Sequence, residues 1–128
     1  YREHLTANIN GTPFAAGFVL GEQVGAELRF QSDQSQERQM FFVVPSDFAP
    51  GTYALVENAG FSVRYAQLFE GEYETQNGSL IISSHDTVLH RVAGTFAYTA
   101  QSFEFGELDE TVEVTDGSFQ FDYWVIEQ

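Results

Sequence analysis

The three histidines are the side chains best suited to catalysis or metal binding near neutral pH. His85 and His90 are five residues apart, so on one continuous strand they would point to opposite faces, whereas a turn at Asp86-Thr87 would bring them nearer. His4 lies far away in the sequence. The sequence has no cysteine and no HxH or HExxH motif. We therefore expect ordinary strand and loop histidines and no zinc site.

Nucleophilic or general acid–base catalysis finds equally little support. No G-x-S-x-G motif occurs, and Gly78-Ser79 and Gly117-Ser118 each begin a predicted strand. Glycoside hydrolysis needs a pair of carboxylates, but in a chain with 19 acidic residues the presence of such a pair does not indicate that activity. We therefore predict a non-enzymatic protein.

Acidic residues crowd one segment strongly enough to suggest a cation. Carboxylate oxygens are the ligands that calcium prefers. The candidate calcium ligands are Glu104, Glu107, Asp109 and Glu110. No DxDxDG loop is present, and a solvated acidic surface would give the same composition. Calcium is the only cofactor that the sequence suggests.

Aromatic side chains are the main candidates for ligand binding, because exposed rings stack on sugars. Trp124, Tyr65 and Tyr73 are the residues that we select. Most of the aromatic residues stand at alternating positions that suit a core. Trp124 and Ile126 are out of phase with the stripe from Phe119 to Val125, and we expect the outer face of this strand to be covered. Exposure of Trp124 and of tyrosines near it would favour ligand binding.

The elements that position these residues are predicted to be strands. Apolar and polar residues alternate between turn signals such as Asn10-Gly11, Asn77-Gly78 and Asp116-Gly117. We expect about ten strands in an antiparallel β-sandwich, as one domain over residues 1–128. A bend is expected near Gly94, and a hairpin turn at Asp116-Gly117. The predicted strands are 4–9, 13–20, 24–31, 38–45, 52–56, 61–68, 72–76, 79–84, 88–100 and 110–126, with 101–109 left as strand, bulged edge or loop.

The charge restricts the partners. The chain has 19 acidic residues against five arginines, no lysine, and a net charge of −14. Such a surface repels phosphate backbones and anionic lipid headgroups, so we expect neither nucleic acid nor a membrane surface as a partner of this domain. High acidity without lysine fits adaptation to high salt, and it equally fits an extracytoplasmic protein of an organism with acidic proteins.

Several short patterns occur in a specific order. They are Leu5–Ala16 (LTANINGTPFAA), Pro50–Leu55 (PGTYAL), Gly78–Ile82 (GSLII), Arg91–Ala100 (RVAGTFAYTA) and Val114–Phe119 (VTDGSF). Together they resemble a family of uncharacterised all-β envelope lipoproteins of the Bacteroidetes and related phyla. The resemblance spans nearly the whole chain and brings no catalytic residues. It departs from the family in its acidity and its lack of lysine.

The resemblance implies a secreted, extracytoplasmic domain of the bacterial cell envelope, in the periplasm or at the cell surface, with a lipid anchor upstream of Tyr1. It also gives a meaning to Asp86-Thr87-Val88, which resembles the Asp-Ser/Thr-aliphatic sequence at which such envelope proteins are O-glycosylated. Thr87 is therefore a candidate glycosylation site, and a plain hairpin turn is the alternative. The expected function is that of a non-enzymatic envelope domain whose protein or glycan partner is unknown. The alternative is a small-ligand or carbohydrate-binding module, in a sandwich or a closed barrel.

Overall fold

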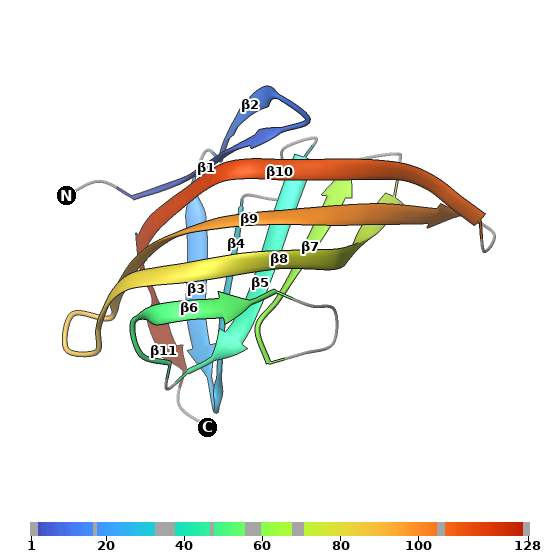
Figure 1. Cartoon of the computed structure of the whole chain (residues 1–128). Coiled ribbons are helices and arrows are strands. Elements are labelled where there is room, and N and C mark those ends of the chain that lie inside the picture. The colour runs from blue at the N-terminus through green and yellow to red at the C-terminus, as the bar shows by residue number, and fades with distance from the viewer. Residues whose placement is uncertain are drawn as a thin grey trace.

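The computed structural model describes residues 3–16, 18–32, 38–46, 48–55, 60–67, 71–104 and 107–126, and every regular element within them is a strand (Figure 1). None of these residues belongs to a helix able to cross a membrane. The strands are β1 (His4–Ile9), β2 (Thr12–Ala15), β3 (Val19–Val24), β4 (Glu27–Ser32), β5 (Arg38–Pro45), β6 (Gly51–Ala54), β7 (Ser62–Gln67), β8 (Gly71–Asp86), β9 (Arg91–Glu104), β10 (Glu107–Asp122) and β11 (Trp124–Ile126).

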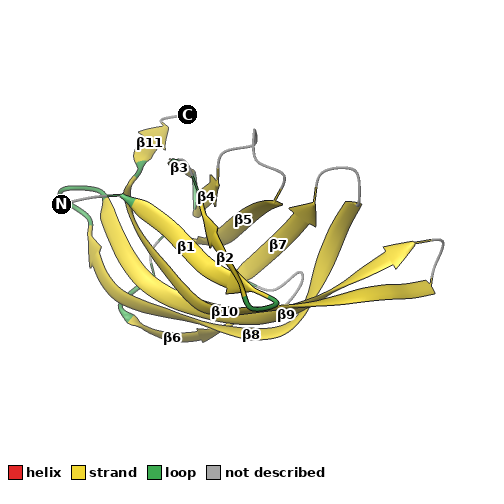
Figure 2. Ribbon diagram, turned by 90° about the horizontal axis from the view of Figure 1, so that it is seen from above, coloured by secondary structure: helices red, strands yellow, loops and turns green. Residues whose placement is uncertain are grey.

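The strands form one hydrogen-bonded path that folds over into two layers. Its order is β11-β3-β4-β5-β7-β8-β9-β10-β1-β2, and β6 pairs with β8 outside this path. The long strands β8, β9 and β10 curve across one layer, and β3, β4, β5 and β7 cross behind them (Figures 1 and 2). All pairs are antiparallel except β11 with β3. The predicted antiparallel, all-β sandwich is confirmed, with two path ends, β11 and β2.

The core lies between the two layers and is filled by the inward half of each alternating pattern. Phe30 on β4 is central to it: its ring stacks on Phe42, with 4.6 Å between centroids, and lies 4.7 Å from Phe121 and 5.1 Å from Phe119. All four side chains are buried. The predicted stripe on the last long strand is therefore confirmed from Phe119 to Tyr123, because these positions face the opposite layer.

Two predicted hairpin turns are wrong. Asn77-Gly78 lies inside the continuous strand β8, and Asp116-Gly117 lies inside β10. The register shifts between Thr75 and Asn77, and again where Asp116 takes a positive φ of 53°, so both sites are bulges. A Cβ on Gly117 would lie 2.5 Å from the ring of Phe96. Residues that suit a hairpin turn thus serve here to bend a strand long enough to cross the whole layer.

Other boundaries follow the prediction more closely. Strand 38–45 coincides with β5, and Asn10-Gly11 forms the predicted turn, with positive φ at both residues. Near Gly94, where the sequence predicts a bend, the facing strand β8 has a register shift between Ile82 and Ser84. The predicted strand 13–20 is instead divided between β2 and β3. The predicted strand 88–100 begins only at Arg91, because residues 87–90 form the turn.

Candidate ligand-binding face

The three aromatic residues selected from the sequence do not form one site. Tyr65 on β7 faces Tyr73 on β8, edge to face with 5.2 Å between ring centroids, and both side chains are buried in the core. Trp124 lies on β11 and is 74% exposed. The prediction that Trp124 is covered is wrong, because β11 is the last strand of the sheet and Trp124 pairs with the outward-facing Glu22 of β3. Only this one of the three presents a ring face to solvent.

The predicted calcium ligands come from the hairpin between β9 and β10. The backbones of Glu104 and Glu107 are opposite each other in this hairpin, and Asp109 and Glu110 follow on β10. The side chains of these four residues lie outside the described part of the structure, so calcium binding stays a prediction. Where side chains are described, no group of three or more histidine, aspartate or glutamate residues is placed to hold a metal ion.

The histidines take part in packing contacts. His85 Nδ1 lies 3.1 Å from the carbonyl oxygen of Phe48, and His85 Nε2 lies 2.7 Å from the hydroxyl of Tyr123. Because a carbonyl only accepts, Nδ1 donates to Phe48, and the neutral ring then accepts from the hydroxyl of Tyr123 at Nε2. His90 packs against the ring of Tyr123, so the turn does bring His85 and His90 to one residue. His4 Nε2 lies 2.9 Å from Ser118 Oγ.

The turn of residues 87–90 is held by a carboxylate and presents Thr87 to solvent. Asp86 Oδ1 accepts hydrogen bonds from the backbone N–H groups of Val88, at 2.9 Å, and Leu89, at 3.0 Å. These two hydrogen bonds lower the pKa of the Asp86 carboxyl below its ordinary value, and the bond from Leu89 has the larger effect. Thr87 is thus exposed on a defined turn, which continues beyond the predicted Asp86-Thr87 to His90.

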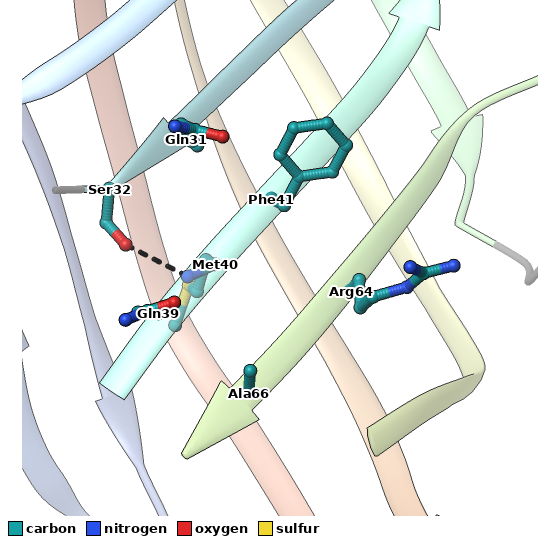
Figure 3. Close-up of a pocket in the computed structure, with 7 residues that line it drawn as sticks. All are labelled: Gln31, Ser32, Gln39, Met40, Phe41, Arg64 and Ala66. Carbon is teal, nitrogen blue, oxygen red and sulfur yellow. Dashed lines mark hydrogen bonds between the residues drawn. The ribbon is translucent and has the colours of Figure 1, made fainter. Parts of the chain in front are cut away.

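A pocket that the sequence reasoning missed lies on the outer face of β4, β5 and β7. It has a volume of about 270 Å³ and is open to solvent. Figure 3 shows Gln31, Phe41 and Arg64, three of its lining residues, one from each of three neighbouring strands. Gln39, Ser32, Met40 and Ala66 complete the lining. The sequence feature that could have indicated this pocket is Phe41, an apolar residue at an outward position between the buried Met40 and Phe42.

The strand register places these groups side by side. Phe30 pairs with Phe42 in the core, and the next positions therefore put Gln31 opposite Phe41 on the outer face. On the other side of β5, Phe41 pairs with Arg64 and Gln39 with Ala66. The short side chain of Ala66 leaves the hollow. The buried hydroxyl of Ser32 accepts the N–H of Met40 at 3.0 Å, which fixes the end of β4 against β5 (Figure 3).

The outer face of the other layer has a different character. One hollow there is lined at outward positions by short polar or small side chains, namely Asn77, Ser79, Ala97, Thr99 and Thr115, together with Glu113. Tyr98, the aromatic residue at this hollow, is buried. An exposed ring beside amides and a guanidinium is therefore a feature of the β4–β5–β7 face.

Comparison with known proteins places the chain in a family. Residues 2–121 match the family described as Domain of unknown function (DUF6252). The chain belongs to the DUF6252 family. The match covers β1 to β9 and all of β10 but its last residue, whereas β11 lies beyond it. No curated protein and no solved structure matches the sequence. The predicted resemblance to a family of unknown function is confirmed at that level.

Proposed function

We propose that this DUF6252 domain is a non-enzymatic, extracytoplasmic binding module that holds a saccharide on the outer face of β4, β5 and β7. One observation carries the proposal: the exposed Phe41 stands between Gln31 and Arg64 in the strand register, and all three residues line an open hollow. The exposure of Trp124 on the same layer supports it, since an exposed tryptophan favours ligand binding over a purely structural role.

The chemistry of the hollow suits a sugar. The C–H face of a pyranose ring packs on an aromatic side chain, and its hydroxyls exchange hydrogen bonds with amides and a guanidinium. Gln31, Gln39 and Arg64 supply those groups. Enclosed small-molecule pockets hold about 300–1,000 Å³, and this open hollow of about 270 Å³ has room for a sugar ring at the surface. The acidic, lysine-free composition favours a neutral glycan over a polyanion.

Replacing Phe41 by alanine tests the site. A glycan array identifies the best saccharide, and calorimetric titration then measures its affinity. Phe41→Ala and Arg64→Gln should each weaken binding at least about tenfold, the effect of losing 1.4 kcal/mol. The matched control is Ile81→Ala: Ile81 is 44% exposed on β8, against 36% for Phe41, and is remote from the hollow. The affinity of the Ile81→Ala variant for the saccharide should change less than about twofold. Equal affinities of the Phe41→Ala variant and the wild type would refute the site.

The location in the envelope is supported by the family resemblance and by the composition, and it leads to a prediction about Thr87. The protein from its native organism should carry a glycan on Thr87, and the protein from a heterologous host should not. Intact-mass measurement distinguishes the two, and Thr87→Ser should keep the glycan whereas Thr87→Ala should lose it. Because Thr87 is exposed, Thr87→Ala should change the free energy of unfolding by less than about 0.5 kcal/mol. An unmodified native mass would contradict the hypothesis.

A further inference from the structure

An apolar surface is exposed at the β11 end of the sheet, apart from the hollow. All three side chains of β11 are exposed, Trp124 at 74%, Val125 at 41% and Ile126 at 43%. Because successive side chains of a strand alternate, Trp124 and Ile126 lie on one face of the sheet and Val125 lies on the other. We call these three residues the β11 patch. A contiguous group of exposed apolar side chains, unlike isolated ones, indicates an interaction site.

The β11 patch lies on an edge that can accept another strand. β11 pairs with β3 on one side, and on its other side it has no strand partner within the described part of the chain. An edge strand carries backbone N–H and C=O groups with which a further strand can pair. The opposite end of the path, β2, contains Pro13, which lacks an N–H and is therefore less suited to pairing. β11 is thus the end at which the sheet can be extended.

The β11 patch is complementary to itself in an antiparallel pair. A two-fold axis through Val125 places this residue opposite its own counterpart and Trp124 opposite Ile126 of the second copy. An aromatic ring beside a β-branched side chain is a favourable cross-strand pair. Trp124 and Ile126 of the two copies then cover each other on one face of the sheet, and the two Val125 side chains meet on the other. Both faces of the edge gain an apolar contact from the same surface, as an isologous dimer requires.

Two carboxylates beside the β11 patch have arginines next to them. Glu22, the partner of Trp124 on β3, has Arg29 opposite it on β4. Asp122, just before β11, forms an ion pair of 2.8 Å with Arg91. These two carboxylates therefore add little repulsion when a second copy approaches, and the long-range repulsion from the net charge of −14 is screened by salt. The edge favours an uncharged, apolar partner surface, and a second β11 supplies one.

We infer that the chain forms a two-fold symmetric dimer in which β11 pairs antiparallel with β11 of a second copy. The layer of β3, β4, β5 and β7 then continues across the axis as one sheet. Each copy contributes a strand of three residues, so the dimer is weak and transient, in the class of interfaces that bury less than about 1,200 Å². The interface is separate from the saccharide hollow over β4, β5 and β7, and it does not depend on that site.

Sedimentation velocity over a range of protein concentrations tests the dimer, and Trp124, the only tryptophan in the chain, reports on its interface. The sedimentation coefficient should rise and the tryptophan emission should shift to the blue over the same range of concentration. Added sodium chloride should strengthen the dimer, because it screens the repulsion between two acidic copies. A dissociation constant above about 1 mM, or dimerisation that leaves the emission of Trp124 unchanged, would overturn the proposal.

Charged residues at the two-fold axis locate the interface. Val125→Glu and Val125→Lys each place two like charges opposite one another, so each variant alone should dimerise at least about tenfold more weakly. An equimolar mixture of the two variants should recover the dimer, because glutamate then lies opposite lysine. The matched controls are Ile81→Glu and Ile81→Lys, which introduce the same charges at a position that is 44% exposed, against 41% for Val125. Each control should change the dissociation constant less than about twofold.

Equal losses at Val125 and Ile81, or a mixture of the two Val125 variants that stays monomeric, would overturn the assignment to β11. Circular dichroism verifies that each variant keeps its strands, and the measurement on the wild type stands without any variant. Vesicles of neutral phosphatidylcholine test the other occupant of the β11 patch. A blue shift of Trp124 with these vesicles, in a chain that stays monomeric, would likewise overturn the proposal.

Discussion

Replacing Phe30 by alanine should lower the free energy of unfolding by about 4 kcal/mol, within the range of about 3–5 kcal/mol for deleting a buried aromatic ring. Phe30 is almost completely buried, and its ring contacts those of Phe42, Phe119 and Phe121. These three partners come from β5 and β10, so the deletion leaves a cavity where the two layers meet. Urea unfolding followed by circular dichroism measures the change.

Phe41→Ala is the matched control for this measurement. Phe41 lies on β5 next to Phe42, but its side chain faces solvent. Its replacement should therefore cost less than about 1 kcal/mol, in keeping with the span of strand propensities. Similar losses from Phe30→Ala and Phe41→Ala would mean that Phe30 is not at the centre of the core.

Replacing Gly94 by alanine should cost about 3 kcal/mol, at the upper end of the range for overpacking. A Cβ at this position would lie 2.2 Å from the carbonyl oxygen of Ile81 and 2.8 Å from the ring of Phe119. The first contact is with backbone of the adjacent strand, which cannot rotate away. The two strands would have to separate where the register shifts between Ile82 and Ser84. Thermal unfolding of the variant measures the loss.

Gly60→Ala provides the comparison for Gly94. A Cβ on Gly60 would meet only Pro45 Cγ, at 3.8 Å, which is an ordinary contact. The expected change in the free energy of unfolding is within about 0.5 kcal/mol. If Gly94→Ala were as stable as Gly60→Ala, the close approach of β8 and β9 at Gly94 would be disproved.

The sequence predicted the layers better than the connections. Alternation alone placed the stripe of Phe119, Phe121 and Tyr123 in the core, because the side-chain period of a strand fixes which residues share a face. It could not distinguish a hairpin turn from a bulge at Asp116-Gly117, because both accept a residue with positive φ, as Asp116 has here. Whether the chain turns back or continues as one long strand depends on how the neighbouring strands pair across the whole layer.

The candidate site was less accessible from the sequence. Tyr65 and Tyr73 had the right chemistry for stacking but occupy core positions, and Trp124 proved exposed because β11 ends the sheet. Phe41, Gln31 and Arg64 come together only through the pairing of β4, β5 and β7. β4, β5 and β7 become neighbours only when the whole sheet forms, with β6 left outside this order. No local sequence pattern predicts that arrangement. The one local signal was the outward phase of Phe41.

The most direct test of the saccharide site is the map of backbone amide chemical shifts during titration with the glycan that the array selects. We predict that the shifts concentrate on the outward residues of β4, β5 and β7, with Gln31, Phe41 and Arg64 among the largest, and that the face around Ser79, Ala97 and Thr99 stays unchanged. Shifts centred on β8, β9 and β10 would contradict the account, as would a saturating titration that leaves the three strands unperturbed.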